Sequence, residues 1–522
     1  MLRLLSKQER LIVWSLALIG FASRVALVFR TDWEIATRPY IEDAFYALSC
    51  ARQLALGHGF SIDGIHPTNG VQPLICLLDA PCFWFSDDRW VGVRLTLVLA
   101  GVIQLLCILV LARLLAQIRV ANPNRVGSRA GSTDPSTSSG QALHVTAPIV
   151  GAFVWAIAAP LLVHNVNGLE TGLYALCILI CLSVYHSILN SGWSTLRAIA
   201  FGVLLGLTVL ARIDAVLFVA SFAAWELWRG RTRAIQPVLT FGLIALAVSA
   251  PWWLYNYHNF GSLMPISGQS EGLGKPIVEN LLQSAAALFD MLTVFFYHRF
   301  YSWDTWVTVA ALAGIAIIWG YFATRFRVAA TGLRAAQSLT PVVLFSLALL
   351  LYYNFFFSAP HFLARYLHPV RILALIGFCM ALPSLLVCSG RICRVGIYFW
   401  LLAGTVFGAQ RYLNDFTGEG TSDFYAMGQW ANKHAGRIGM GQSGTAGFIA
   451  SNIVNLDGKV NPDALRARKS GRIGEYIARE HIEYLADWLL IVDPLVRAAH
   501  DAGVEYQRVD SVGYLLIYRR VN

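Results

Sequence analysis

The sequence predicts an α-helical polytopic membrane protein with about eleven transmembrane helices and a small C-terminal α/β domain. Its composition is 57% hydrophobic and only 13% charged, with a mean hydropathy of +0.57, whereas soluble domains are about 25% charged. Apolar runs of nearly the length that crosses a bilayer recur up to about residue 410. From about Arg411 the composition becomes that of a soluble protein. We therefore expect a membrane module over 1–410 and an α/β domain over 411–522.

The apolar runs place the spans one by one. The first follows the basic segment MLRLLSKQER without a small-residue cleavage site, so we expect it to be retained. The fifth and sixth are short, and we expect them to be half-exposed helices that meet at Arg212 and Asp214. The predicted spans lie near residues 11–29, 91–113, 147–165, 168–189, 197–212, 214–228, 236–256, 304–324, 338–357, 369–389 and 395–410.

Arginine and lysine set the expected orientation. The N-terminus and every second connection carry most of the basic residues, which places those segments on the cytoplasmic side. Residues 120–145 are rich in Ser, Gly and Pro and predict a flexible cytoplasmic linker. The same alternation makes Gly70–Phe85 a surface helix, and we expect Leu281–Phe300 to be a surface or re-entrant helix. The net charge of +10 is thus explained by topology and lipid contact, and we expect no nucleic-acid partner.

The C-terminal domain contains short strand-like runs around a helix. Its glycine-rich segment GQSGTAGF has neither the GxGxxG nor the GxSxG spacing, so a structural turn is the favoured interpretation. Asp457 is of a type that contacts sugars, but Asp457 and Gly458 also form an ordinary turn, which we favour. The predicted strands are Arg437–Met440, Ile453–Leu456, Trp488–Val492 and Tyr514–Tyr518, with a helix over Pro462–His481.

The first outer loop, residues 31–90, holds most of the polar residues that interrupt the apolar chain. Within it Ile41–Leu56 predicts an amphipathic helix, because Pro39 stands near its start, glycine follows its end, and apolar residues recur at helical spacing. Glu42 and Asp43 then fall in its first turn. Capping of the helix dipole explains two such carboxylates as well as chemistry does.

Further polar residues cluster at the outer ends of the spans. Charged groups at membrane depth are costly unless they pair or face a polar cavity, so they are functional candidates, with interfacial anchoring or ion pairing as the alternative. Because these clusters share a face with the first loop, we infer a cavity that opens outward and sideways into lipid. The candidate residues for binding a donor phosphate or sugar are His66, Asn69, Glu170, Arg212, His298, Arg299, Arg365 and His368.

The residue types in such a cavity suit one reaction. A carboxylate can take the proton of an acceptor hydroxyl, and arginines can hold a phosphate through paired hydrogen bonds. Glycosyl transfer from a lipid-linked sugar phosphate requires this pairing, with cations stabilising the departing phosphate. Direct displacement would invert the anomeric centre. The donor arrives dissolved in the bilayer, so no nucleotide-binding fold is needed.

The acidic pair that opens a helix, the stretch PTNGVQPL and Arg94 in VGVRLTLVL together resemble the GT-C superfamily of polytopic glycosyltransferases. This superfamily includes protein mannosyltransferases, the aminoarabinose transferase of lipid A and bacterial arabinofuranosyltransferases. The resemblance implies that Asp43 is the catalytic base and Glu42 its neighbour or a metal contact. It implies a polyprenyl-phosphate monosaccharide as donor and a cell-surface glycan, lipid or protein as acceptor. NGLETGLYAL and VNLDGKVN are most similar to bacterial members with a C-terminal extracytoplasmic domain, including the arabinofuranosyltransferase-like ones.

The resemblance also implies a location in a bacterial inner (cytoplasmic) membrane, with the active site and the C-terminal domain in the periplasm. Metal use is mixed in the superfamily, and no spacing such as HExxH occurs, so a divalent cation stays open as a cofactor. The alternative function is a transporter or flippase of lipid-linked sugars, although no repeat relates the halves. A ligase that moves a whole glycan from a pyrophosphate carrier is a third interpretation, with its catalytic residues in a later loop.

Overall fold

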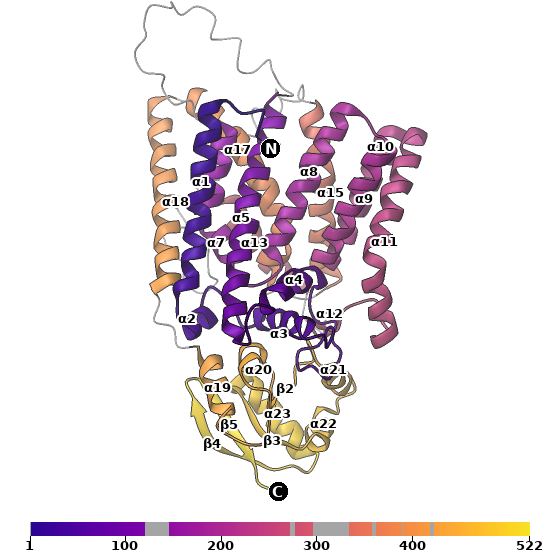
Figure 1. Ribbon diagram of the computed structural model, residues 1–522, viewed down its shortest axis with the longest axis vertical. Helices are drawn as coiled ribbons and strands as arrows, with labels where there is room; N and C mark the ends of the chain where they lie inside the picture. Colours follow the sequence, from indigo (N-terminus) through magenta and orange to yellow (C-terminus); the bar gives the residue numbers. More distant parts are fainter. Residues whose placement is uncertain are drawn as a thin grey trace, which may run out of the picture.

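The computed structural model describes residues 2–120, 146–271, 277–295, 333–357, 362–388, 390–417 and 422–522. Long helices form a bundle, the C-terminal domain covers one end of it, and the short helices of the first loop lie between the two (Figure 1). The span expected at 304–324 and nearly all of the expected linker at 120–145 lie outside the described residues, and so does the end of the helix expected over Leu281–Phe300.

Each of the other expected spans coincides with a helix or with a pair of helices. They are α1 (Lys7–Val25) with η1 (Ala26–Phe29), α5 (Arg89–Val120), α6 (Ala147–Ile157) with α7 (Ala159–Asn165), α8 (Thr171–Ser191), α9 (Thr195–Ala211), α10 (Val216–Gly230), α11 (Ile235–Phe260), α15 (Leu333–Phe355), α17 (His368–Cys388) and α18 (Arg391–Thr417).

Length and hydropathy qualify fewer of these helices as membrane spans. Within the described residues five helical segments are long and apolar enough to cross a membrane, or six if α6 and α7, bent by 60°, form one span. One of these segments, Ile213–Phe260, contains both α10 and α11, whereas α9 is a shorter apolar helix. The helices therefore support a multi-pass membrane protein, but the predicted count of eleven is not confirmed.

Short helices occupy the outer connections. The predicted amphipathic helix is present as α3 (Ala44–Ala55), and the predicted surface helix is present as α4 (Pro73–Asp79) with η2 (Ala80–Phe83). α3 begins two residues after Glu42, so the acidic pair stands just before the helix rather than in its first turn. The remaining outer helices are α2 (Asp32–Thr37), α12 (Ile266–Glu271), α13 (Ile277–Leu292) and α16 (Leu363–Tyr366).

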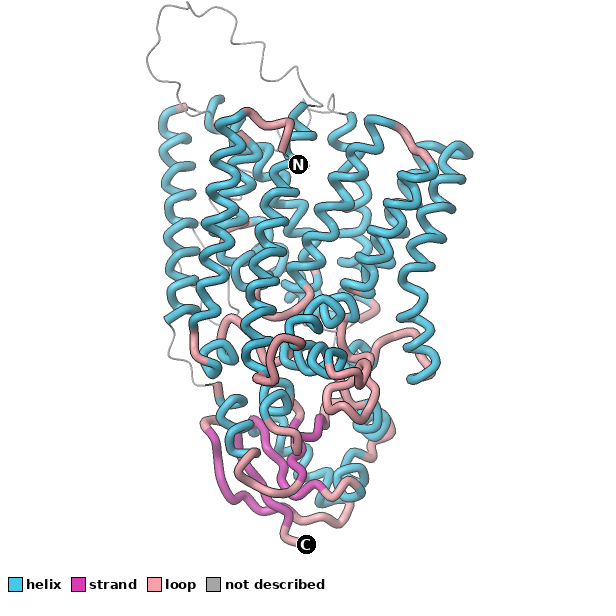
Figure 2. The backbone as a smooth tube through the Cα atoms, viewed as in Figure 1, coloured by secondary structure: helices cyan, strands magenta, loops and turns pink. Residues whose placement is uncertain are grey.

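The C-terminal domain is a five-stranded sheet with helices on both faces, and within the described residues the strands occur only here (Figure 2). The strand order is β2-β1-β3-β5-β4, with β1 parallel to β2 and β3, and β5 antiparallel to β3 and β4. The elements are α19 (Asp423–Ala431), β1 (Arg437–Met440), α20 (Gly444–Ile449), β2 (Ile453–Asn455), α21 (Pro462–Lys469), α22 (Ile473–Arg479), β3 (Ile482–Trp488), α23 (Leu489–Asp501), β4 (Tyr506–Val512) and β5 (Leu515–Arg520).

One strand prediction in this domain is wrong. The apolar run Trp488–Val492 is not a strand, because β3 ends at Trp488 and α23 follows it. Periodicity cannot separate a short apolar run from part of a buried helix, and Val492, Leu495 and Ala499 are buried at helical spacing. The helix expected over Pro462–His481 is two helices, α21 and α22, separated at a glycine with positive φ. β4 was not expected, since its exposed residues lack apolar alternation.

The carboxyl ends of the parallel strands meet the first loop. α20, which follows β1, packs against α3, and the Phe448 ring lies 5.3 Å from that of Phe45 and 5.8 Å from that of Trp90. The hydroxyl of Tyr46 accepts a hydrogen bond from the Ser443 amide at 3.1 Å. Open α/β sheets bind ligands at this edge. The edge of the sheet at which such domains bind ligands therefore faces the membrane module.

A matched pair of glycines in α20 tests this docking. A Cβ at Gly444 would overlap the backbone oxygen of Glu42, whereas a Cβ at Gly447 would make an ordinary contact 3.8 Å from Ile453. We expect Gly444→Ala to loosen the domain from the first loop and Gly447→Ala to leave it in place. Limited proteolysis of the purified protein measures the difference. Equal cleavage rates for the two variants would contradict this interface.

Candidate active site

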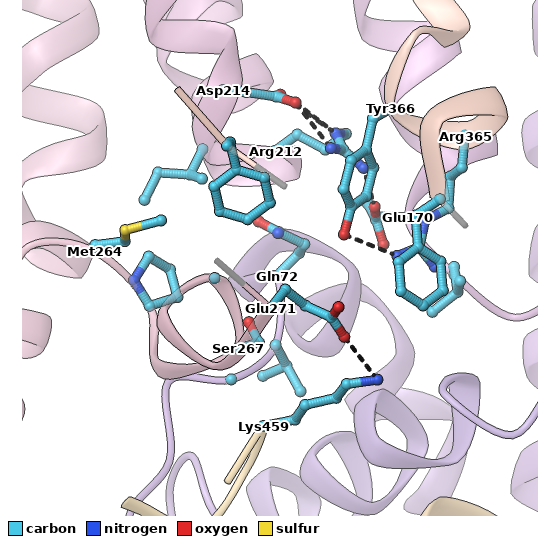
Figure 3. A pocket seen from close by; sticks show the side chains of 18 of the residues that line it. Gln72, Glu170, Arg212, Asp214, Met264, Ser267, Glu271, Arg365, Tyr366 and Lys459 are labelled. Atoms are coloured by element: carbon cyan, nitrogen blue, oxygen red, sulfur yellow. Dashed lines mark hydrogen bonds and ion pairs between the residues drawn. The ribbon is translucent and has the colours of Figure 1, made fainter. Parts of the chain in front are cut away.

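A cavity of about 480 Å³ lies between the first loop, the ends of several long helices and the C-terminal domain, and we call it the main cavity. Its charged side chains gather where the first loop, α12 and the C-terminal domain meet, and also just before α8, between α9 and α10, and on α16 (Figure 3). Apolar side chains of α4, α10, α11 and the α15 end form much of the remaining wall. The charged lining residues are Asp43, Glu170, Arg212, Asp214, Glu271, Arg365 and Lys459.

Asp43 is the carboxylate that the first loop contributes to this cavity. It is the N-cap residue of α3, but its side chain makes no capping hydrogen bond. Instead its Oδ1 lies 3.7 Å from the Nζ of Lys459, and its side chain is 20% exposed. Asp43 therefore does not cap the helix through its side chain, and its carboxylate is accessible from the cavity.

Lys459 reaches the main cavity from the C-terminal domain, just after β2. Its Nζ lies 2.9 Å from Oε1 of Glu271 and 3.9 Å from Oδ2 of Asp457. Burial disfavours the ammonium, but the carboxylates of Asp43, Asp457 and Glu271 outweigh burial and raise the pKa of Lys459 above its ordinary value. Burial raises the pKa of Asp457 to about 6. The lysine is thus held in its charged form.

Glu42 lines a second cavity, which has a volume of about 570 Å³. Its Oε1 accepts a hydrogen bond from the amide of Gly444. Desolvation and the neighbouring Asp43 carboxylate raise the pKa of Glu42 well above its ordinary value. The raised pKa favours the neutral form of Glu42, and Asp43 rather than Glu42 lines the main cavity. Arg365 and Phe362 line both cavities.

Arg212 is bound by two carboxylates at the far wall of the main cavity. Its guanidinium lies 2.7 Å from Glu170 and 2.8 Å from Asp214, and all three side chains are buried. Its Cζ lies 4.6 Å from the ring centre of Tyr366, and the Tyr353 hydroxyl donates to Asp214 at 2.7 Å. Because two carboxylates already match its charge, Arg212 has little capacity left for a phosphate.

Arg365 differs from Arg212 because it forms no ion pair with any carboxylate in the described part of the chain. Its guanidinium lies over the rings of Phe362 and Tyr366, at 5.0 and 5.1 Å, and its Nε is buried with no hydrogen-bond partner among the described residues. A half-buried guanidinium that lines a cavity and lacks a counter-ion is suited to an anionic ligand.

The other sequence candidates lie elsewhere. His66 is exposed and pairs with Asp63 at 2.7 Å. Asn69 is buried. Its side chain donates a hydrogen bond to Asn256 and accepts one from the backbone amide of Ile266, so it fixes the start of α12. His368 is buried and borders neither of the two large cavities. His298 and Arg299 lie outside the described residues. The structure thus brings four of the candidates together in the main cavity: Asp43, Glu170, Arg212 and Arg365. Glu42 lines the second cavity instead.

The main cavity contains several carboxylates, a ligand type that divalent cations prefer. No group of three or more His, Cys, Asp or Glu side chains in the described ranges is arranged to hold one. The carboxylates of Asp43, Glu271 and Asp457 do face a common point, but the Lys459 ammonium lies there. The residues at this point therefore do not fit a divalent cation as they stand.

Sequence reasoning missed Lys459 and Glu271. Lys459 stands in VNLDGKVN, a segment singled out only for its resemblance and its turn, and that turn is present: Gly458 has a φ of +82°. Glu271 lies in an outer connection of which only the later part was interpreted. Lysine is rare in this chain, which was the one available signal. Neither position carries a local pattern that predicts contact with the first loop.

Comparisons with known proteins found likeness in structure alone. No family model matches the chain, and no curated protein matches it significantly. An oligosaccharyltransferase of Archaeoglobus fulgidus, solved with a tethered acceptor peptide, is similar with a TM-score of 0.58 at 12% identity, covering 94% of this chain and 72% of that one. AglB of the same organism, solved with an inhibitory peptide and a dolichol-phosphate, is similar with a TM-score of 0.55 at 12% identity. This match covers 92% of this chain and 69% of that one.

A third solved structure matches the full length. ArnT of Cupriavidus metallidurans, solved with bound undecaprenyl phosphate, is similar with a TM-score of 0.53 at 11% identity. The match covers 97% of each chain. The likeness therefore extends over the membrane module and the C-terminal domain together.

Proposed function

From its GT-C fold, the fold of polytopic membrane glycosyltransferases, we propose that this chain is an inverting glycosyltransferase. It moves a single sugar from a polyprenyl-phosphate donor to a cell-surface glycan, lipid or protein. Asp43 is the base and Arg365 binds the donor phosphate. Among possible sugars we favour an arabinofuranosyl group, on the similarity of NGLETGLYAL and VNLDGKVN to such transferases.

One observation carries this proposal: Asp43 and Arg365 line the same cavity, whose remaining wall is largely apolar. The charged end suits a sugar phosphate, and the apolar wall, with Ile75, Leu217 and Trp253 among its residues, suits a polyprenyl chain. The structures of AglB and ArnT hold a dolichol-phosphate and an undecaprenyl phosphate, respectively, which supports a lipid-linked donor.

The reaction follows from the two groups. The Asp43 carboxylate takes the proton of the acceptor hydroxyl as its oxygen attacks the anomeric carbon. The bond from that carbon to the phosphate oxygen breaks, and its electron pair leaves with the lipid phosphate. The Arg365 guanidinium stabilises the charge that develops on the phosphate. The second cavity is the proposed acceptor route, because it adjoins the main cavity at Phe362 and Arg365, the two residues of the described ranges that line both spaces.

The orientation is proposed on the placement of charge. Arg229, Arg231 and Arg233 lie where α10 turns into α11, at the end of the bundle away from the C-terminal domain (Figure 1). Basic residues favour the cytoplasmic side. The main cavity and the C-terminal domain then face the periplasm of a bacterial inner membrane.

The decisive experiment is a transfer assay with protein reconstituted in liposomes. Synthetic polyprenyl-phosphate monosaccharides are supplied with cell-envelope acceptors, and labelled product is followed with its anomeric configuration. We expect sugar transfer with inversion. A parallel flux measurement tests the transporter alternative: movement of the donor across the bilayer without transfer would refute the enzyme.

Glu271 favours a second candidate, the transfer of a whole glycan from a pyrophosphate carrier. It lies in α12, in the later outer connection, yet lines the same cavity as Asp43. The oligosaccharyltransferase likeness is consistent with this arrangement. A polyprenyl-pyrophosphate oligosaccharide in the same assay separates the two, since the proposed monosaccharide transferase leaves it unchanged.

A further inference from the structure

We propose that Lys459 is a positioning residue of the main cavity, its ammonium standing where a divalent cation would otherwise neutralise the surrounding carboxylates. This inference rests on the proposed function, in which Asp43 is the base. It assigns the C-terminal domain a direct part in the active site: the domain supplies the positive charge that lies beside the Asp43 carboxylate and holds it in place.

The contacts of the ammonium carry the inference. Lys459 Nζ lies 3.7 Å from Asp43, 2.9 Å from Glu271 and 3.9 Å from Asp457, so it joins the first loop, α12 and the C-terminal domain at one point. It also lies 5.4 Å from the ring centre of Phe362, which lines both cavities. Figure 3 shows it directed toward Glu271 from the side of the C-terminal domain.

Distance and charge separate an ammonium from a metal at this point. Metal–oxygen distances of about 2.0–2.6 Å are shorter than the 2.9–3.9 Å found here. Three carboxylates around one ammonium leave two negative charges, and loss of the ammonium leaves three on side chains that are partly shielded from water. Such a cluster attracts a divalent cation, provided that the side chains move inward by about 1 Å.

The backbone holds Lys459 rigidly enough for this part. The Asp457 side chain accepts a hydrogen bond from the Lys459 amide at 2.8 Å, and the Asn455 side chain accepts one from the Gly458 amide at 3.1 Å. The Ser270 hydroxyl of α12 donates to the Asp457 carbonyl at 2.7 Å. The turn after β2 is therefore fixed on both sides, and the lysine projects from it.

The test compares Lys459→Ala with wild type on the full-length protein in detergent, by titration with Mn²⁺ followed by electron paramagnetic resonance. We expect the variant to bind Mn²⁺ at least about tenfold more tightly than wild type, because a carboxylate cluster has lost its counter-ion. Asp43→Asn in the variant background should abolish the gain. Lys459→Arg keeps the charge and should bind no better than wild type. Lys459→Met is the second variant if Lys459→Ala does not fold.

The activity arm uses the transfer assay with a chelator present. We expect Lys459→Ala to lose at least about tenfold in kcat, as for a group that orients a catalytic base, and to recover part of it when Mn²⁺ is added. Lys469→Ala is the matched control, since Lys469 also contacts α12, at Gln269, but is exposed and borders neither cavity.

Two results would overturn the inference: equal Mn²⁺ affinity in wild type and variant, or full turnover of Lys459→Ala with chelator. Because the Mn²⁺ titration needs no substrate, it still decides the role of Lys459 if no donor supports transfer. Failure of the proposed function is thus distinguishable from failure of this inference.

Discussion

Asp43→Asn is expected to lower kcat for sugar transfer by about 10³-fold while the protein stays folded, because a general base contributes roughly 10²–10⁴-fold. The amide cannot take the acceptor proton, and Glu42 is poorly placed to replace it, since it faces the second cavity and its raised pKa favours the neutral acid. Initial rates of transfer at saturating donor measure the effect. Folding is checked by thermal unfolding in detergent, where a partly exposed ion pair contributes at most about 1 kcal/mol.

The matched control is Asp63→Asn. Asp63 belongs to the same loop and also carries an ion-paired carboxylate, but it is not part of the main cavity and pairs with the exposed His66. We expect near wild-type turnover for this variant. An Asp43→Asn enzyme as active as Asp63→Asn would remove Asp43 from its assigned role.

Arg365→Ala is expected to weaken donor binding by about 100-fold, equivalent to about 2.8 kcal/mol. Hydrogen bonds to a charged group contribute roughly 1.5–3 kcal/mol each, and the guanidinium can make two to one phosphate. Arg365→Lys should recover only part of this affinity, because an ammonium lacks the planar pair of donors. The measurement is the dissociation constant of a polyprenyl-phosphate sugar, with KM in the transfer assay as a second readout.

Arg212→Met is the contrasting variant. It leaves the buried carboxylates of Glu170 and Asp214 without their partner, and removal of one member of a buried ion pair costs about 3–5 kcal/mol. We expect a clear fall in thermal stability here and little in Arg365→Ala. Two results together would contradict these assignments: an Arg212→Met protein that stays stable but loses affinity for the donor, and an Arg365→Ala protein that keeps that affinity. Arg212 would then be the phosphate ligand and Arg365 would not.

Local sequence was sufficient for the helices and for the first catalytic candidate. Apolar runs of bilayer length are a local property, so the helices were found close to their true bounds, including the surface helix α4. The count of spans was less secure, because a short helix such as α9 can be shielded by its neighbours without meeting the length of a full span. The strand predicted over Trp488–Val492 is wrong for a related reason, because a few apolar residues fit a strand or a buried helix equally well.

The sequence by itself determined that this chain is built of apolar helices long enough to cross a membrane, that polar groups stand at the ends of those helices, and that Asp43 stands beside a helix start. Tertiary structure decided which of those groups meet. Arg212 and Arg365 are both candidates for the donor phosphate in the sequence, yet one is neutralised by Glu170 and Asp214 while the other has no carboxylate partner in the described ranges. Lys459 reaches Asp43 across most of the chain length. Hydropathy and periodicity are set by neighbours in sequence, whereas charge pairing depends on distances in space that only packing fixes.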